Sequence, residues 1–191
     1  METTKKIIIY QVFTRLFGNQ NKTCQPDGDI ETNGCGKMND FTKQALHEIK
    51  KLGATHIWYT GLLAHASQTD YTAYGIPKNH PSIVKGKAGS PYAIRDYYDV
   101  DPDLAEHVDK RMEEFEELVK RTHECGLKMI IDFVPNHVAR QYHSIAKPQG
   151  VKDLGENDDC TQAFNPQNNF YYIPGQKLEG EIDFYNPAMG T

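Results

Sequence analysis

The stretch Asp132-Phe133-Val134-Pro135-Asn136-His137 follows directly on the apolar run Met129-Ile130-Ile131. The apolar residues of such a strand belong to a core, whereas the Asp, Asn and His that follow it are suited to line a cleft. Parallel α/β proteins place their active sites at the carboxyl ends of their strands. Pro135 fixes its own φ and restricts Val134, so the turn is stiff and sets the directions of Asn136 and His137. We interpret the stretch as the wall of a binding site. The alternative is a strand whose Asp caps the next turn and whose His is an ordinary loop residue.

Strand, helix, glycine and strand recur on the amino-terminal side of this wall. Residues 5–13 and 55–59 are β-branched and aromatic, which is typical of strands, and residues 127–134 predict a third strand. Asp40 is the predicted cap of a first helix, which Gly53 ends, and Gly126 ends a second one. The apolar stripes of the two helices are Phe41, Ala45, Ile49 and Leu52, and then Leu104, Val108, Met112, Phe115, Leu118 and Val119. The repeat predicts right-handed βαβ units in a parallel sheet.

Long polar loops separate these elements. Residues 18–37 show no regular apolar period, and such loops are uncommon in compact domains unless they are functional. Residues 62–103 form another loop at the carboxyl end of a strand, where it is placed to shape a binding site. Its polar and aromatic residues are His65, Asp70, Tyr71, Tyr74, His80, Tyr92, Arg95, Asp96, Tyr97 and Tyr98. We interpret the acidic residues of the second helix as a solvated face rather than a cation site; they are Glu113, Glu114, Glu116 and Glu117.

The composition changes after the binding wall. Residues 138–191 are rich in Asn, Asp, Gly, Pro and Tyr and contain candidate strands at 170–173 and 182–185. We therefore predict two parts: an α/β domain over residues 1–137, and an irregular β-rich segment over residues 138–191 that is inserted after the third strand.

Charge and cysteine spacing narrow the class of partner. The 26 acidic and 21 basic residues give a net charge of −5 without a long basic run, so nucleic acid and anionic membranes are poor candidates and a neutral small molecule or polymer fits better. The four cysteines show no C-x-x-C spacing, which argues against a zinc ribbon. No apolar run is long enough for a membrane segment, and no signal-peptide pattern is present. Because a cleaved signal would leave no trace in the sequence, secreted, periplasmic and cytoplasmic locations all stay open.

The motifs in this order resemble the α-amylase family, glycoside hydrolase family 13. The Asp132–His137 stretch resembles its first conserved region, in which an Asp, three residues and Asn-His end the third barrel strand. Residues 10–13, 52–58 and 96–102 resemble the first strand, the second strand and the loop before the following helix. The resemblance implies an α/β fold: the amino-terminal portion of a (β/α)8 TIM barrel, about three βα units over residues 1–137, with the start of the inserted B domain over 138–191.

The family also implies roles for single residues. His137 would donate or accept a hydrogen bond with a hydroxyl of the sugar in the −1 subsite, and Tyr92 would stack on the same ring. Asp132 would support the active site by orienting an arginine near the nucleophile. Asn136 matches a frequent calcium ligand, with Asp158 and Asp159 as further candidates by position. Calcium is thus the cofactor that the resemblance suggests.

The motifs that match the family do not contain its two reacting carboxylates. Retaining glycosidases use a nucleophile and an acid/base carboxylate about 5 Å apart, and in this family they follow the fourth and fifth strands. The 191 residues hold three predicted strands and no Arg-x-Asp sequence, whereas a closed barrel takes about 250 residues. We therefore expect no catalytic residue within this chain, no activity of the chain alone, and self-association through the open sheet edge.

Two kinds of function fit these residues. The first is the amino-terminal part of a retaining glycoside hydrolase that acts on α-linked glucans such as starch or maltooligosaccharides. Transglycosylases and sugar isomerases of the same family fit the first three strands equally well. The second is a non-catalytic fragment that binds glucan or assembles with another chain.

Overall fold

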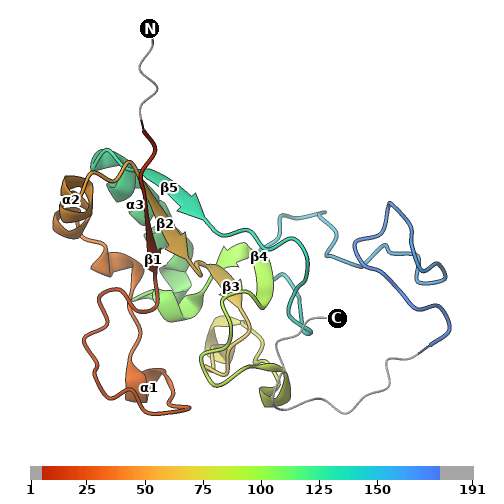
Figure 1. Ribbon diagram of the computed structural model, residues 1–191. Helices are drawn as coiled ribbons and strands as arrows, with labels where there is room; N and C mark the ends of the chain where they lie inside the picture. Colours follow the sequence, from red (N-terminus) through yellow and green to blue (C-terminus); the bar gives the residue numbers. More distant parts are fainter. Residues whose placement is uncertain (1–5, 177–191) are drawn as a thin grey trace, which may run out of the picture.

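A three-stranded parallel sheet lies at the centre of the computed structural model, which describes residues 6–176 (Figure 1). Its strands are β1 (Ile9–Phe13), β2 (His56–Thr60) and β5 (Lys128–Ile131), in the order β1-β2-β5. Val12 pairs with Tyr59, which pairs in turn with Ile131. The predicted α/β class with parallel strands is confirmed, and the wall residue Asp132 comes directly after β5.

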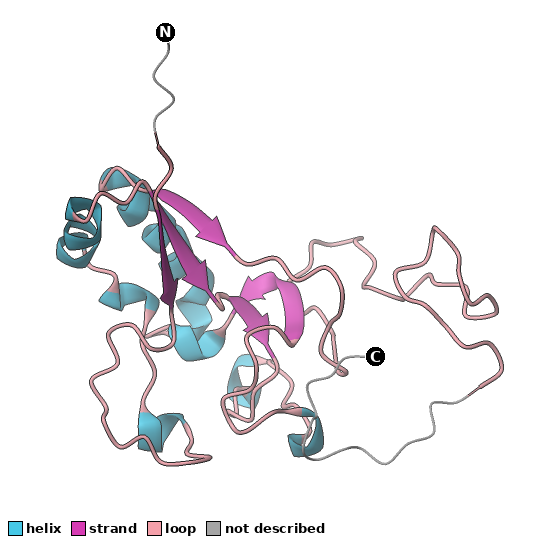
Figure 2. Cartoon of the chain, viewed as in Figure 1, coloured by secondary structure: helices cyan, strands magenta, loops and turns pink. Residues whose placement is uncertain are grey.

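Two helices cover one face of this sheet (Figure 2). They are α2 (Lys43–Lys51) and α3 (Arg111–Glu124). Ile57 and Tyr59 of β2 are fully buried against Leu46 of α2 and Leu118 of α3. Each such side chain contributes roughly 1.5–3 kcal/mol of hydrophobic stabilisation. The other face of the sheet is open among the described residues, and Ile9 there is 51% exposed.

The first helix begins later than its sequence predicts. Thr42 caps α2, since its hydroxyl accepts a hydrogen bond from Ala45 N at 3.2 Å. Asp40, the predicted cap, instead accepts from Lys37 N at 2.6 Å and closes the short 3-10 helix η1 (Met38–Asp40). Leu52 lies beyond the helix and is 72% exposed, so it is not part of the apolar face.

The second helix is also shorter than its apolar stripe. Leu104 and Val108 belong to separate 3-10 helices, η4 (Pro102–Leu104) and η5 (Val108–Lys110), because Pro102 starts its own turn. The solvated-face interpretation holds for Glu113, Glu116 and Glu117 but is wrong for Glu114. Glu114 is 8% exposed and accepts from Glu106 N at 2.9 Å and His107 N at 2.7 Å.

A two-stranded antiparallel sheet lies inside the region predicted as a single loop. β3 (Leu63–His65) pairs with β4 (Ile94–Val100), with register shifts on both sides of Ala64. The remaining short helices are α1 (Ile30–Asn33), η2 (Thr72–Tyr74) and η3 (Pro81–Ile83). The small sheet brings residues 63–65 and 94–100 to the carboxyl ends of β1 and β2.

The segment after residue 137 is hydrogen-bonded to β4, and beyond these bonds it has no regular secondary structure in the described residues. Asp96, which is fully buried, accepts hydrogen bonds from Ile145 N at 2.8 Å and Ala146 N at 3.3 Å. The strand predicted at 170–173 is wrong, because Phe170 lies in a bend and residues 171–173 have no regular secondary structure, and no strand occurs in 138–176. The other candidate strand, 182–185, lies outside the described residues. The boundary at residue 138 stays a prediction.

Within the described residues, no helix has the length and hydropathy required to cross a bilayer.

Candidate functional site

Asp132 is held at two points where β5 ends. Its Oδ1 accepts from Trp58 Nε1 at 2.7 Å, and its Oδ2 accepts from Gly61 N at 2.9 Å. Trp58 lies in β2 and Gly61 follows that strand. The carboxylate therefore joins the carboxyl ends of two neighbouring parallel strands, which is the edge where α/β proteins place their sites.

The Pro91–Tyr92 turn lies against the same glycine. Gly61 has φ +80°, and a Cβ added there would lie 2.9 Å from Pro91 Cβ and 3.1 Å from the Phe13 ring. Tyr92 is 45% exposed, and its amide donates to Ser90 Oγ at 3.3 Å. Asp132 and the turn that carries Tyr92 thus meet at Gly61, although they are 40 residues apart in the sequence.

His137 pairs with its own neighbour. Its Nδ1 lies 3.0 Å from Asn136 Oδ1, an acceptor, so the proton is assigned to Nδ1. Nε2 then accepts hydrogen bonds and is the nitrogen that a sugar hydroxyl would meet. No hydrogen bond joins His137 to Tyr92 among the described residues, so their convergence on one sugar ring stays a prediction.

Tyr97 holds the backbone of the binding wall, a role that the sequence did not reveal. Its hydroxyl donates to Val134 O and lies 3.4 Å from His137 O. Its ring packs against Phe133 and Tyr142, with centroids 5.8 Å away in each case. Tyr97 therefore fixes the turn that carries His137 from the neighbouring strand β4. The signal was present only as one aromatic residue among many in the 62–103 region.

The residues expected to bind calcium do not lie in a cluster of three or more His, Cys, Asp or Glu among residues 6–176. Calcium takes six to eight oxygen ligands, whereas no group of three or more His, Cys, Asp or Glu is arranged to hold a metal in residues 6–176. Asp158 accepts from Phe170 N and Tyr172 Oη, each at 2.9 Å, and Asp159 accepts from Thr161 N at 3.0 Å. Both carboxylates are engaged in their own loop. Calcium binding by Asn136 stays a prediction.

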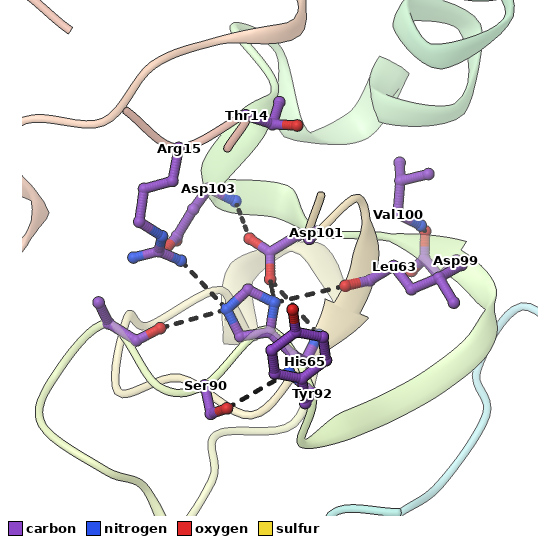
Figure 3. A network of polar contacts seen from close by, with 12 residues as sticks. Thr14, Arg15, Leu63, His65, Ser90, Tyr92, Asp99, Val100, Asp101 and Asp103 are labelled. Carbon is purple, nitrogen blue, oxygen red and sulfur yellow. Dashed lines mark hydrogen bonds and ion pairs between the residues drawn. The ribbon is translucent and has the colours of Figure 1, made fainter. Parts of the chain in front are cut away.

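A buried ionic network lies behind the Tyr92 turn, and sequence reasoning did not find it (Figure 3). His65 Nδ1 lies 2.8 Å from Asp101 Oδ2, and both side chains are at most 2% exposed. Arg15 Nη2 donates to Asp103 Oδ2 at 3.1 Å and lies 3.1 Å from His65 Nε2. Tyr71 Oη donates to Asp103 Oδ1 at 2.8 Å. The network joins the residue after β1 to β3 and to the residues after β4.

The charges of this network balance when His65 is protonated. Burial by itself would lower the pKa of His65, but the Asp101 carboxylate outweighs burial and raises it. Burial would raise the pKa of Asp101, but His65 and Arg15 lower it, so this carboxyl stays ionised. Burial and the neighbouring Asp101 charge raise the pKa of Asp103. Two cations thus face two carboxylates in a largely buried network, in which Arg15 is 15% exposed.

This network positions the Tyr92 turn. His65 Nε2 lies 3.2 Å from Ala88 O, and a Cβ added to Gly89 would lie 1.8 Å from Ala66 O. Residues 88–89 are therefore pressed against β3 and the residue that follows it, three residues before Tyr92. Figure 3 shows Ser90 and Tyr92 beside His65.

A comparison with known protein families gives the decisive match. The family model "Alpha amylase, catalytic domain" matches residues 11–184. The chain belongs to this family. The match extends from β1 through the Asp132–His137 wall and into the segment that follows it.

The chain is also similar to individual proteins and solved structures. Trehalose-6-phosphate hydrolase of Bacillus subtilis (strain 168) is 27% identical over 138 residues, covering 72% of this chain and 18% of that protein. The amino acid transporter heavy chain of Rattus norvegicus is 41% identical over 206 residues, covering 95% of this chain and 25% of that protein. A crystal structure of an α-amylase from Lactobacillus plantarum is 26% identical, with a TM-score of 0.48, and covers 73% of this chain and 24% of that one. The chain spans a quarter or less of the length of these proteins.

Proposed function

We propose that this chain forms one wall of the substrate cleft of a retaining glycosidase that acts on α-linked glucans. The observation that carries the proposal is the Asp132 carboxylate, which is fixed between the carboxyl ends of β2 and β5 beside the Pro91–Tyr92 turn. Membership of the α-amylase catalytic-domain family supports a glycosidase in general terms. The (β/α)8 barrel, the inserted B domain and the preference for starch-like glucans are parts of the proposal.

In this proposal the chain binds and orients the sugar. Both oxygens of Asp132 are engaged by Trp58 and Gly61, so this carboxylate supports the site rather than attacking an anomeric carbon. His137 Nε2 accepts a hydrogen bond from a sugar hydroxyl, and the exposed ring of Tyr92 lies against the pyranose face. The two reacting carboxylates that a retaining mechanism requires are supplied from outside these residues.

A non-catalytic role is the second candidate. It is favoured by the 41% identity to a chain named as an amino acid transporter heavy chain, across 95% of this chain. In that case the scaffold would assemble with another protein, and the surface around Asp132 would bind no sugar.

The test is a titration of the purified 191-residue chain with maltoheptaose, observed through Trp58. Trp58 is the only tryptophan of the chain and donates to Asp132, so its fluorescence reports on this site alone. We expect a saturable change in emission. Tyr92→Ala and His137→Ala should each weaken binding by roughly 3- to 10-fold, the effect of one ring contact or hydrogen bond of about 1 kcal/mol.

Matched variants serve as controls. Tyr98 is 44% exposed, close to the 45% of Tyr92, and His123 is exposed on α3. Tyr98→Ala and His123→Ala should leave the titration unchanged. Product analysis of the same samples should show no shortened glucan. A flat Trp58 signal would contradict the binding role, and turnover that tracks the 191-residue species would contradict the absence of reacting carboxylates.

A further inference from the structure

One nitrogen of the buried His65 ring lies between a hydrogen-bond donor and a hydrogen-bond acceptor (Figure 3). Nε2 is 3.1 Å from Arg15 Nη2 and 3.2 Å from Ala88 O. An arginine nitrogen only donates, and a backbone carbonyl oxygen only accepts. Nε2 therefore bonds Ala88 when it carries a proton and bonds Arg15 when it does not, but it cannot bond both.

The other ring nitrogen keeps its proton in both cases. Nδ1 lies 2.8 Å from Asp101 Oδ2 and 3.3 Å from Leu63 O, which are both acceptors. Because Asp101 has a lowered pKa, its carboxyl stays ionised beside the ring. His65 thus gains or loses its proton at Nε2, the nitrogen that faces Ala88.

The bond to Ala88 links the Tyr92 turn, residues 88–92, to the rest of the fold. The flanking residues Lys87 and Ala93 are bonded through their carbonyl oxygens to the segment after β3, at 2.8 Å and 2.9 Å. Between them, within the part of the chain that the structure describes, only the bond from His65 joins the turn to another element. Loss of this bond therefore frees the turn locally, while its ends stay anchored.

The charges around His65 favour the protonated ring. Burial lowers the pKa of His65, but the Asp101 carboxylate outweighs burial and raises it above the ordinary value of 6.5. Without the His65 proton, the Arg15 cation alone faces two carboxylates. The titratable and charged groups of the surrounding elements are Asp101, Asp103, Arg15, Lys37, Tyr71 and Cys35.

The other groups of this network titrate away from His65. Burial raises the pKa of the Cys35 thiol to about 11, and burial also raises the pKa of Tyr71, so both keep their protons at neutral pH. Burial and the Asp101 charge raise the pKa of Asp103 from 3.8, but this carboxyl bonds Arg15 and Tyr71 rather than the turn. His65 is therefore the titrating group that contacts the turn.

We propose that His65 is a positioning residue whose protonation state sets the place of the Tyr92 turn. With a proton on Nε2, the imidazolium donates to Ala88 O and holds the turn against β3. When that proton passes to solvent, Nε2 accepts from Arg15 and Ala88 O is released. The inference rests on the proposed function, because the turn carries the ring that lies against the sugar. Sugar binding is then tighter at the lower pH, where the turn is held.

The first measurement follows the turn without any sugar. NMR spectra of the 15N-labelled 191-residue chain are recorded from about pH 5.5 to about pH 9.5. We expect the His65 ring and the Gly89 amide to titrate with one common midpoint above pH 6.5. The amide of Leu118, fully buried in α3, should stay fixed, which separates local release from unfolding. His80→Gln is the control, since His80 lies in the same loop but bonds Ser82.

Arg15→Gln tests the competing donor. Removing the cation beside Nε2 favours the charged ring, so the midpoint of the Gly89 amide should rise by about one pH unit or more. A residue that only supports the fold would not move this midpoint. Lys85→Gln is the matched control, because Lys85 is an exposed cation of the same loop and should leave the midpoint unchanged. If Arg15→Gln does not fold, the wild-type titration still decides.

The second measurement compares maltoheptaose binding by wild type and Tyr92→Ala across the same pH range. Both chains keep His137, so its own titration cancels in the ratio of their affinities. The ratio should be roughly 3 to 10 at the lower pH, the effect of about 1 kcal/mol, and should fall towards 1 above the His65 midpoint.

The outcomes distinguish this inference from the proposed function. A Gly89 amide that moves with His65, together with a falling ratio, supports both. A turn that moves in a chain that binds no maltoheptaose at any pH supports the positioning role and rejects the proposed function. If glucan binds but the Gly89 amide stays fixed while His65 titrates, if His65 does not titrate in this range, or if the ratio stays constant, the inference is overturned and the wall stands.

Discussion

Replacing Asp101 by alanine is expected to lower the free energy of unfolding by about 3–5 kcal/mol, because it leaves a buried cation without its partner. Asp101 and His65 are at most 2% exposed and 2.8 Å apart, and Asp101 also accepts from Asp103 N at 2.9 Å. The comparison is urea unfolding of wild type and variant near pH 5.5. Asp109→Ala is the control, since Asp109 is exposed in η5 and should cost within about 0.5 kcal/mol.

The pH dependence of that difference separates an ionic role from a packing role. The raised pKa of His65 gives stability that is fully present below its ordinary value of 6.5 and is lost as pH rises through the folded pKa. The lowered pKa of Asp101 gives stability that is present above 3.8 and is lost as pH falls through its folded pKa. The difference between wild type and Asp101→Ala should therefore be largest between 3.8 and 6.5. A difference that stays constant from pH 4 to pH 9 would contradict the ion pair.

Gly89→Ala is expected to destabilise the chain by at least about 3 kcal/mol, because two separate costs fall on one residue. Gly89 has φ +74°, and a Cβ there would lie 1.8 Å from the backbone oxygen of Ala66. A non-glycine residue pays roughly 1–2 kcal/mol for this conformation alone. The backbone clash adds the rest, since no side chain can move aside. The displaced turn also carries Tyr92, so the Trp58 titration should weaken in the same variant.

Gly75→Ala is a control with the same backbone conformation. Gly75 has φ +74° as well, but nothing lies within 4 Å of an added Cβ. Its cost should stay near the 1–2 kcal/mol of the left-handed conformation. Urea unfolding of both variants measures the gap between them. Equal destabilisation of the two would show that the contact between Gly89 and Ala66 does not constrain the turn.

The sequence predicted the elements whose apolar residues follow one period. The strands around residues 9–13, 56–60 and 128–131 and the helices α2 and α3 were located by such runs. β4 was missed because Arg95, Asp96 and Asp99 are buried in it, so its seven residues do not alternate between apolar and polar. β3 was missed because it is short and its register shifts around Ala64. The start of α2 differs from its predicted position because Thr42, rather than Asp40, caps this helix.

The sequence predicted the Asp132–His137 wall of the candidate site but not the buried network that supports the Tyr92 turn. Asp132 could be placed because it ends an apolar strand. The partners of the buried network could not, since Arg15 and Asp103 are 88 residues apart and buried charges carry no apolar period. The strand predicted at 170–173 was wrong for a related reason. Aromatic residues favour strands, and the sequence does not distinguish a ring in a sheet from a ring such as Tyr171 that faces solvent.

The most direct measurement of the central claim is an NMR titration of the His137 imidazole with maltotriose. The chain has eight histidines, and His137→Ala identifies the signal. We expect the His137 signal to shift saturably, with a Kd in the millimolar range, or about 4 kcal/mol of binding free energy. The signal of His123 on α3 should not move. A His137 signal that stays fixed while maltotriose binds elsewhere on the chain would contradict a sugar-binding wall at Asp132–His137.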